Sequence, residues 1–260
     1  MTASTEEAGH ISRDELTLGR ISLDQPEDGP RVNADTILLA SYVRDTFSGA
    51  RGGRDVLDMG CATGAIALIL ARRFPELHSI RGMDIQGDLI RLARENAKRN
   101  GLEGRVSFLE GDLRNIRELF PPQSFDVVVS NPPYESPGSG RLSASRSDMV
   151  ARQEVSCTLD ELGTACRYLL RNRGRLYLVF KAERMCELLA TLSRRGLEPK
   201  RARMVHPLKD RKASVVLVES LKGGRPGMMI EPPLFIHDAG GGYTADFLSA
   251  YREDGLSCST

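Results

Sequence analysis

The chain has 260 residues, of which 40% are hydrophobic and 27% are charged, a globular composition that excludes a chain disordered throughout. Its 36 Lys and Arg residues nearly balance 35 Asp and Glu residues, so net charge alone indicates no class of partner. The longest apolar run, residues 65–71, is far shorter than the ~20 residues of a membrane-spanning helix, and the acidic N-terminus is unlike a signal peptide, so we expect a cytoplasmic protein.

The first fifty residues predict an extension that precedes the main domain. Residues 1–15 are polar and acidic, and we expect them to be flexible. Residues 16–23 alternate between apolar and polar side chains, which predicts a strand that ends at the turn-forming cluster 25–30. Asn33 or Asp35 can then cap a helix. Residues 16–50 are therefore predicted to form a strand-and-helix extension.

From residue 54 onward, strands alternate with helices. The pattern predicts strands at 55–59, 78–84, 106–109, 125–130, 175–180, 200–206 and 214–219, helices at 65–73, 88–99, 159–170 and 183–194, and a short helical piece at 113–120. This alternation is typical of a doubly wound, mostly parallel sheet. The last two strands have no helix between them, which predicts an antiparallel C-terminal hairpin. We therefore predict a Rossmann-like α/β domain at 51–221, with a tail at 222–260 that packs on it.

A glycine-containing motif, DMGCATG, begins at Asp58 and joins the first strand of this domain to its first helix. In a doubly wound sheet this position borders the ligand cleft. The next strand ends at Asp84, whose carboxylate can accept two hydrogen bonds from a ribose diol. The spacing Gly60-x-x-x-Gly64 lacks the GxGxxG phosphate loop of nicotinamide sites. Together with Asp112, these acids favour a cationic, phosphate-free nucleoside cofactor, and the alternative is a tight turn without a ligand.

These segments resemble the successive cofactor motifs of class I S-adenosylmethionine-dependent methyltransferases. The resemblance implies that Asp58 belongs to the cofactor motif, that Gly60 and Gly64 line the methionine and ribose, that Asp84 holds the ribose hydroxyls, and that Asp112 meets the adenine amine. One departure is Ala62, which replaces the usual middle glycine of the motif. We expect its methyl group to be tolerated only if the residue keeps a negative φ.

A second motif, Asn131-Pro132-Pro133-Tyr134, follows the strand at 125–130 at the same edge of the sheet. A conjugated amino nitrogen is a poor nucleophile, so an enzyme must orient it toward the methyl group. The side-chain carbonyl of Asn131, which also borders the cofactor, and the backbone carbonyl of Pro132 can accept from its two N–H bonds. Tyr134 offers a face for stacking, beside Pro133.

The second motif predicts in-line attack of an NH2 group on the sulfonium methyl, without a strong base. An ordinary turn after a strand is the alternative. The motif resembles that of amino-methyltransferases acting on adenine N6, guanine N2 or the glutamine amide.

Further segments resemble the bacterial tRNA1(Val) adenine-37 N6-methyltransferase family, from about residue 16 to about residue 247. They are GPRVNADTILLA at 29–40, ARQE at 151–154 with CTL at 157–159, and EPPL at 231–234 with GYT at 242–244. The resemblance implies an adenine in a tRNA anticodon loop as the substrate. Methylation of a release-factor glutamine or of guanine N2, and a binding module that has lost catalysis, are the alternatives. The short segment before residue 55 argues against the release-factor family, whose N-terminal domain is larger.

Basic residues after the second motif predict contacts to RNA phosphates, with an affinity that falls steeply with salt. Residues 194–212 hold eight Lys and Arg residues, including Lys209, Arg211 and Lys212. The predicted substrate contacts are Arg141, Arg146, Arg152, Lys200, Arg201 and Arg203. A solvated surface is the alternative. The Ser- and Gly-rich loop at 135–150 is a candidate lid over the substrate, and a disordered segment is the alternative.

Five cysteines show no CxxC spacing and no neighbouring histidine cluster. We therefore expect reduced thiols and no metal site. Cys61 is predicted to be a packing residue, since no adjacent base would activate it. We expect tRNA as the partner, no association with a membrane or a metal, and a monomer.

Overall fold

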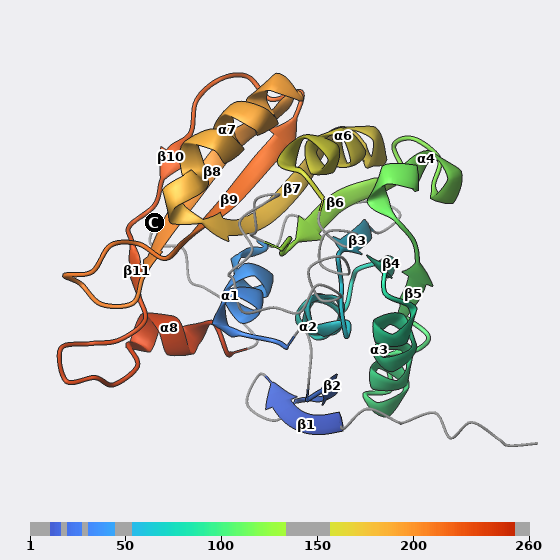
Figure 1. Cartoon of the computed structure of the whole chain (residues 1–260), viewed down its shortest axis with the longest axis horizontal. Coiled ribbons are helices and arrows are strands. Elements are labelled where there is room, and N and C mark those ends of the chain that lie inside the picture. The colour runs from blue at the N-terminus through green and yellow to red at the C-terminus, as the bar shows by residue number, and fades with distance from the viewer. Residues whose placement is uncertain (1–10, 17–19, 28–30, 45–53, 134–156, 253–260) are drawn as a thin grey trace, which may run out of the picture.

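The computed structural model describes residues 11–16, 20–27, 31–44, 54–133 and 157–252 (Figure 1). Strands β1 (Ile11–Leu16) and β2 (Ile21–Pro26) form an antiparallel hairpin that precedes α1 (Ala34–Tyr42). The following elements are β3 (Asp55–Met59), α2 (Ala65–Arg73), β4 (Ser79–Asp84), α3 (Gly87–Arg99), β5 (Val106–Glu110), η1 (Leu113–Asn115), α4 (Ile116–Leu119), β6 (Phe125–Ser130), α6 (Leu159–Leu169), β7 (Leu170–Lys181), η2 (Ala182–Arg184), α7 (Met185–Arg194), β8 (Leu197–His206), β9 (Val215–Lys222), β10 (Met229–Ile230), β11 (Leu234–Phe235) and α8 (Ala245–Ser249).

Nine of the described strands form one sheet in the order β10-β8-β9-β7-β6-β3-β4-β5, and β11 also pairs with β8. Strands β3 to β7 run parallel, whereas β9 lies antiparallel between β7 and β8. The predicted doubly wound α/β fold and its antiparallel C-terminal hairpin are confirmed. Because the strand order reverses between β3 and β6, the carboxyl ends of these two strands border a topological switch point.

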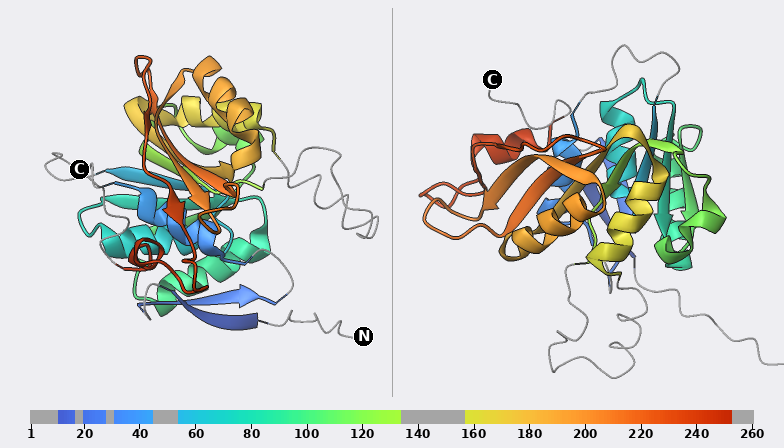
Figure 2. Two further views of the ribbon diagram at one scale, coloured as in Figure 1. Left: turned by 90° about the vertical axis from the view of Figure 1, so that its left-hand side faces the viewer. Right: turned by 90° about the horizontal axis from the view of Figure 1, so that it is seen from above.

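The sheet lies between two layers of helices (Figures 1 and 2). Helices α1, α2 and α3 cover one face together with the β1–β2 hairpin, and α4, α6 and α7 cover the other. Strand β6 shows why both faces are buried: Val127 and Val129 pack into the first core, and Val128 packs into the second. Among the helices that the structure describes, none has the length and apolar character needed to cross a bilayer.

The N-terminal hairpin differs from the sequence prediction. Residues 11–15 form most of β1, so the expectation of a flexible segment is wrong for them, while residues 1–10 lie outside the described part of the chain. The predicted strand at 16–23 is instead two strands, and β2 continues through Pro26. Strand β1 is mostly polar and is held by main-chain pairing and by the Arg13–Asp24 ion pair, neither of which produces an apolar pattern.

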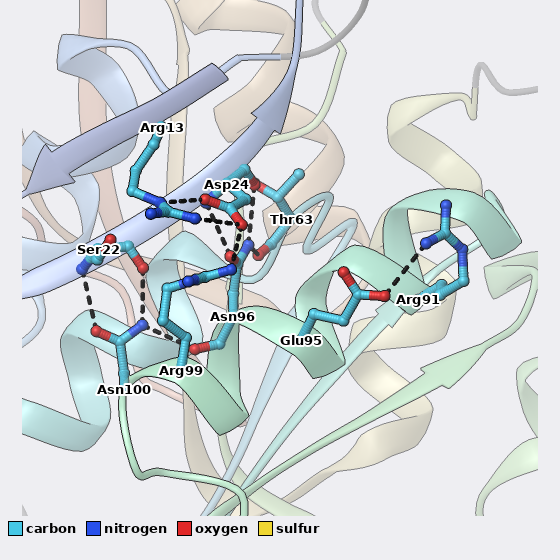
Figure 3. A network of polar contacts seen from close by, with 9 residues as sticks. All are labelled: Arg13, Ser22, Asp24, Thr63, Arg91, Glu95, Asn96, Arg99 and Asn100. Carbon is cyan, nitrogen blue, oxygen red and sulfur yellow. Dashed lines mark hydrogen bonds and ion pairs between the residues drawn. The ribbon is translucent and has the colours of Figure 1, made fainter. Parts of the chain in front are cut away.

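Asn96 of α3 and Asn100, the C-cap of this helix, lie one helical turn apart and hold β2 by its main chain (Figure 3). Asn100 Oδ1 accepts from Ser22 N at 3.0 Å, and Asn96 Oδ1 accepts from Asp24 N at 2.8 Å. Asn96 is fully buried, and its Nδ2 donates both to Asp24 O and to the carbonyl of Thr63, at 3.0 and 3.1 Å. Because Thr63 belongs to the first motif, the hairpin and α3 brace the loop between β3 and α2.

Candidate functional site

The first motif forms a tight loop at the carboxyl end of β3, held against the end of β4. The backbone N–H groups of Gly60 and Cys61 donate to the carbonyl of Met83 at 2.8 and 3.0 Å. Gly60 and Gly64 have φ values of 76° and 88°, which favour glycine. A Cβ on Gly64 would lie 2.6 Å from the ring of Phe108, whereas a Cβ on Gly60 would meet no protein atom within 4 Å. Gly64 therefore allows the loop to pack closely against Phe108, whereas the space beside Gly60 is not filled by protein atoms.

Ala62 occupies a left-handed conformation with φ 45°, so the expectation that alanine is tolerated here only at a negative φ is wrong. A non-glycine residue in this region costs about 1–2 kcal/mol. Its backbone N–H donates to Asp84 Oδ2 at 2.9 Å, and this bond to a carboxylate helps to hold the strained residue. Ala62 therefore keeps the backbone geometry that a glycine would have there.

A cavity of about 240 Å³ opens at the carboxyl ends of β3, β4, β5 and β6. Its lining includes Asp84 and Asp112 of the predicted cofactor site, and Asn131, Pro132 and Pro133 of the second motif. A smaller cavity of about 120 Å³ adjoins it and shares the lining residues Gly60, Ala62 and Asn131. The two motifs that the sequence singles out thus meet at one site.

Two carboxylates lie in the wall of the larger cavity. Asp84 is buried, and its Oδ1 and Oδ2 accept from the backbone N–H groups of Gln86 and Ala62. Asp112 caps η1 by accepting from Arg114 N, and both of its oxygens accept from Arg114 Nε at 2.9 and 2.7 Å. The Arg114 guanidinium lowers the pKa of Asp112, so this carboxylate is ionised at neutral pH. Arg114 also lines the cavity, and the sequence analysis missed it.

Asp58 and Gly64 lie outside the lining of both cavities, so their predicted contact with a cofactor is not supported. Asp58 is fully buried behind the loop, where its Oδ2 accepts from Ala67 N at 3.2 Å. Its Oδ1 has no hydrogen-bond partner among the residues that the structure describes. Burial raises the pKa of Asp58 to about 7. This side chain joins β3 to α2 and supports the loop from behind.

Asp58 makes stability dependent on pH. Because burial raises its folded-state pKa from 3.8 to about 7, the folded state binds the proton more tightly than the unfolded state. We expect this group to lower the free energy of unfolding as pH rises from about 4 to about 7, by at most about 1.4 kcal/mol per pH unit. Urea denaturation between pH 5 and 8.5 tests this against Asp58→Asn, which should lack that slope. Parallel pH curves for the two proteins would contradict the assignment.

The second motif is anchored where β6 ends beside β3. Ser130 Oγ donates to the carbonyl of Met59 at 2.8 Å in a buried position. The side chain of Asn131 donates through Nδ2 to Thr36 Oγ1 of α1 at 3.1 Å. Pro132 is buried, and Pro133 is exposed at the rim. Tyr134, the predicted lid at 135–150 and the arginines at 141, 146 and 152 lie outside the described residues, so their roles stay predictions.

The predicted RNA contacts on β8 are not supported by the structure. Arg201 is buried and forms ion pairs with Glu219 and Glu231. Arg203 is also buried and forms an ion pair with Asp246. Lys200 donates to the backbone carbonyls of Arg225 and Gly227. These cations bind internal acceptors because β10, β11 and α8 cover this edge of the sheet, which residue type alone does not indicate.

The remaining reactive groups do not suggest a nucleophile or a metal site. Burial raises the pKa of Cys61, in the first motif, and of Cys157, in the wall of the larger cavity, so both are neutral thiols. Within the described ranges, no group of three or more His, Cys, Asp or Glu side chains is arranged to hold a metal ion.

Comparisons with known proteins show the family of the chain. A family model described as a methyltransferase domain matches residues 51–190. A curated tRNA1(Val) (adenine(37)-N6)-methyltransferase of Porphyromonas gingivalis is 29% identical over 90% of this chain and 92% of that protein. A second strain's protein of the same name is 31% identical over 67% of this chain and 68% of that protein. The Tolumonas auensis protein of that name is 26% identical over 92% and 95% of the two chains.

A solved structure shares the fold: a predicted O-methyltransferase from Agrobacterium tumefaciens has a TM-score of 0.66 at 19% identity, over 86% of this chain and 98% of that chain. At this identity the likeness shows the fold alone. The sequence relatives go further, because the family model spans more than half of the chain and the curated relatives align along most of it. The chain therefore belongs to the methyltransferase domain family and, within it, to the family whose curated members are named tRNA1(Val) (adenine(37)-N6)-methyltransferase.

Proposed function

We propose that this protein transfers a methyl group from S-adenosylmethionine to N6 of an adenine in a tRNA anticodon loop. The observation that carries the proposal is that Asn131 and Pro132 border the same cavity as Asp84 and Asp112. The relatives are named for adenine 37 of tRNA1(Val), and that nucleotide is the proposed substrate.

The cavity fits a cationic nucleoside cofactor without phosphate groups. Asp84 and Asp112 place negative charge in its wall, and Gly60 leaves space where a side chain would project. Asp84 would hold the ribose hydroxyls, and Asp112 would lie near the adenine amine. S-adenosylmethionine supplies an electrophilic methyl group when it is bound.

The second motif would orient the acceptor nitrogen. The amine of adenine is conjugated with its ring, so its lone pair must be turned toward the methyl group before it reacts. The side-chain carbonyl of Asn131 and the backbone carbonyl of Pro132 would accept its two N–H bonds and fix that geometry. No buried base is needed in this reading, because the nitrogen becomes acidic once it carries the positive charge.

A basic loop at the same edge of the sheet supports an RNA substrate. Strand β9 is antiparallel to both β7 and β8, so β8 and β7 end at the edge where β6 ends. The loop after β8 exposes Lys209, Arg211 and Lys212. Lys212 also lines an open groove of about 540 Å³ beside Lys181 and Asp35. We propose that this loop, rather than Arg201 and Arg203, meets tRNA phosphates. We also propose a cytoplasmic location, since the proposed substrate is a tRNA.

The proposed reaction is tested with radiolabelled S-adenosylmethionine and tRNA from a strain that lacks the gene. After transfer, the tRNA is digested and the labelled nucleoside is identified. N6-methyladenosine is the expected product. Labelled N2-methylguanosine, or transfer to the glutamine of a release factor instead of tRNA, would overturn the substrate assignment.

Asp84→Asn is expected to weaken binding of S-adenosylhomocysteine by about 10- to 100-fold, because it removes one charge-assisted hydrogen bond to the ribose and turns an N–H toward a backbone donor. Isothermal titration calorimetry measures this affinity. The matched control is Asp88→Asn, which changes an exposed acid in the first turn of α3. Equal affinities for the two variants would show that Asp84 does not hold the cofactor.

A further inference from the structure

A short chain of hydrogen bonds joins the start of α1 to the second motif. Asn33 caps α1, and its Oδ1 accepts from Thr36 N at 3.1 Å. The same Oδ1 accepts from Thr36 Oγ1 at 3.2 Å. Thr36 Oγ1 in turn accepts from Asn131 Nδ2 at 3.1 Å. Thr36 and Asn131, which this chain of hydrogen bonds brings together, are 95 residues apart in the sequence.

The donor and acceptor properties of these groups fix the direction of the chain. A backbone N–H can only donate, so the atom of Asn33 that faces it is the carbonyl oxygen. That oxygen can only accept, and the single proton of the Thr36 hydroxyl is therefore directed to Asn33. Thr36 Oγ1 then acts as an acceptor toward Asn131. Only the NH2 side of the Asn131 amide satisfies it, so the carbonyl oxygen of Asn131 is turned away from Thr36.

The position of Thr36 connects this orientation with the site. Thr36 is 8% exposed in the first turn of α1, and it lines the smaller cavity together with Asn131. The proposed reaction needs the Asn131 carbonyl to accept from a substrate amine. A flipped amide would instead present its own N–H groups to that amine, with two donors facing each other.

We propose that Thr36 is a positioning residue, whose hydroxyl selects the amide orientation of Asn131 that can accept from the substrate NH2. This inference rests on the proposed function. Thr36 does not touch the reacting atoms. It acts through Asn131, and the capping residue Asn33 sets the direction of its hydroxyl proton.

Thr36→Val and Thr36→Ser test the proposal, since valine keeps the shape without the hydroxyl and serine keeps the hydroxyl. We expect Thr36→Val to lower kcat for tRNA methylation by about 5- to 30-fold, with the Kd for S-adenosylhomocysteine and the KM for tRNA changed by less than about threefold. Thr36→Ser is expected to restore most of the lost rate. Thr191→Val changes a buried threonine of α7 that lines neither cavity, and this control should keep the wild-type rate.

A second measurement does not depend on catalysis. The side-chain amide of Asn131 is followed by ¹⁵N–¹H correlation in the protein bound to S-adenosylhomocysteine, and it is assigned by its absence in Asn131→Ala. We expect this signal to move in Thr36→Val and to stay in place in Thr36→Ser.

An unmoved amide signal and an unchanged kcat in Thr36→Val would overturn the proposal. Equal losses in the valine and serine variants would also overturn it, since they would indicate packing instead of hydroxyl direction. Wild-type protein that methylates no tRNA would refute the proposed function, and the amide signal would still test the hydrogen-bond chain.

Discussion

Asn131→Ala is expected to reduce methyl transfer to tRNA by about 10²- to 10³-fold, while the affinity for S-adenosylhomocysteine changes by less than about threefold. The variant removes the side-chain acceptor and leaves the target amine with the backbone carbonyl of Pro132 alone. Single-turnover transfer and calorimetric binding measure the two quantities separately. If Asn131→Ala still binds S-adenosylhomocysteine normally, its slower transfer results from a poorly oriented nucleophile and not from lost cofactor binding.

Two further variants sharpen the test of Asn131. Asn131→Asp keeps an acceptor but removes the NH2 group that donates to Thr36, so we expect a rate between those of wild type and Asn131→Ala. Asn172→Ala changes an exposed asparagine of β7 that lies outside both cavities and serves as the matched control. Undiminished transfer by Asn131→Ala would refute the proposed role of the second motif.

Elements with a strong apolar pattern could be predicted from the sequence, and elements held by polar contacts could not. The predicted boundaries of β3 and α2 agree with the structure, because both are short segments in which nearly every side chain is buried, and turn-forming residues follow each of them. Strand β7 begins at Leu170, five residues before the predicted start. Its first part contains Arg173 in a left-handed conformation and is held by Arg171, which pairs with Asp55 at 2.8 Å. Such a segment has the composition of a turn.

The residues of the candidate site also fall into those that the sequence predicts and those that it does not. Asp84 and Asn131 could be predicted because strand ends at a switch point define their place. Thr36 could not, since its contact with Asn131 depends on how α1 packs against the sheet. The prediction that Arg201 and Arg203 contact RNA was wrong, because the type of a residue indicates its charge but not whether it is buried. A pattern thus locates a site more reliably than it identifies the residues that support it.

Arg201 belongs to an ion cluster around the buried Glu219, which we define as Arg175, Glu219, Arg201, Glu231 and Arg44. Glu219 is 1% exposed and pairs with both Arg175 and Arg201. Arg201 Nε also donates to Glu231 at 2.7 Å, and Arg44 lies 2.9 Å from the same carboxylate oxygen. Since Glu231 directly follows β10, the cluster attaches the C-terminal segment to β8 and β9.

Glu219→Gln is expected to lower the free energy of unfolding by about 3 kcal/mol, because the buried Arg201 loses one of its two carboxylate partners and the one-third exposed Arg175 loses its partner Glu219. For a chain of this size the melting temperature should fall by roughly 10 °C. Calorimetry measures the loss of stability. The control is Glu187→Gln, which changes an exposed acid paired with Arg184 and should cost less than about 1 kcal/mol.

Arg201→Met should also destabilise the fold, yet leave the salt dependence of tRNA binding unchanged. A reduced salt slope with unaltered stability would return Arg201 to the RNA-binding surface.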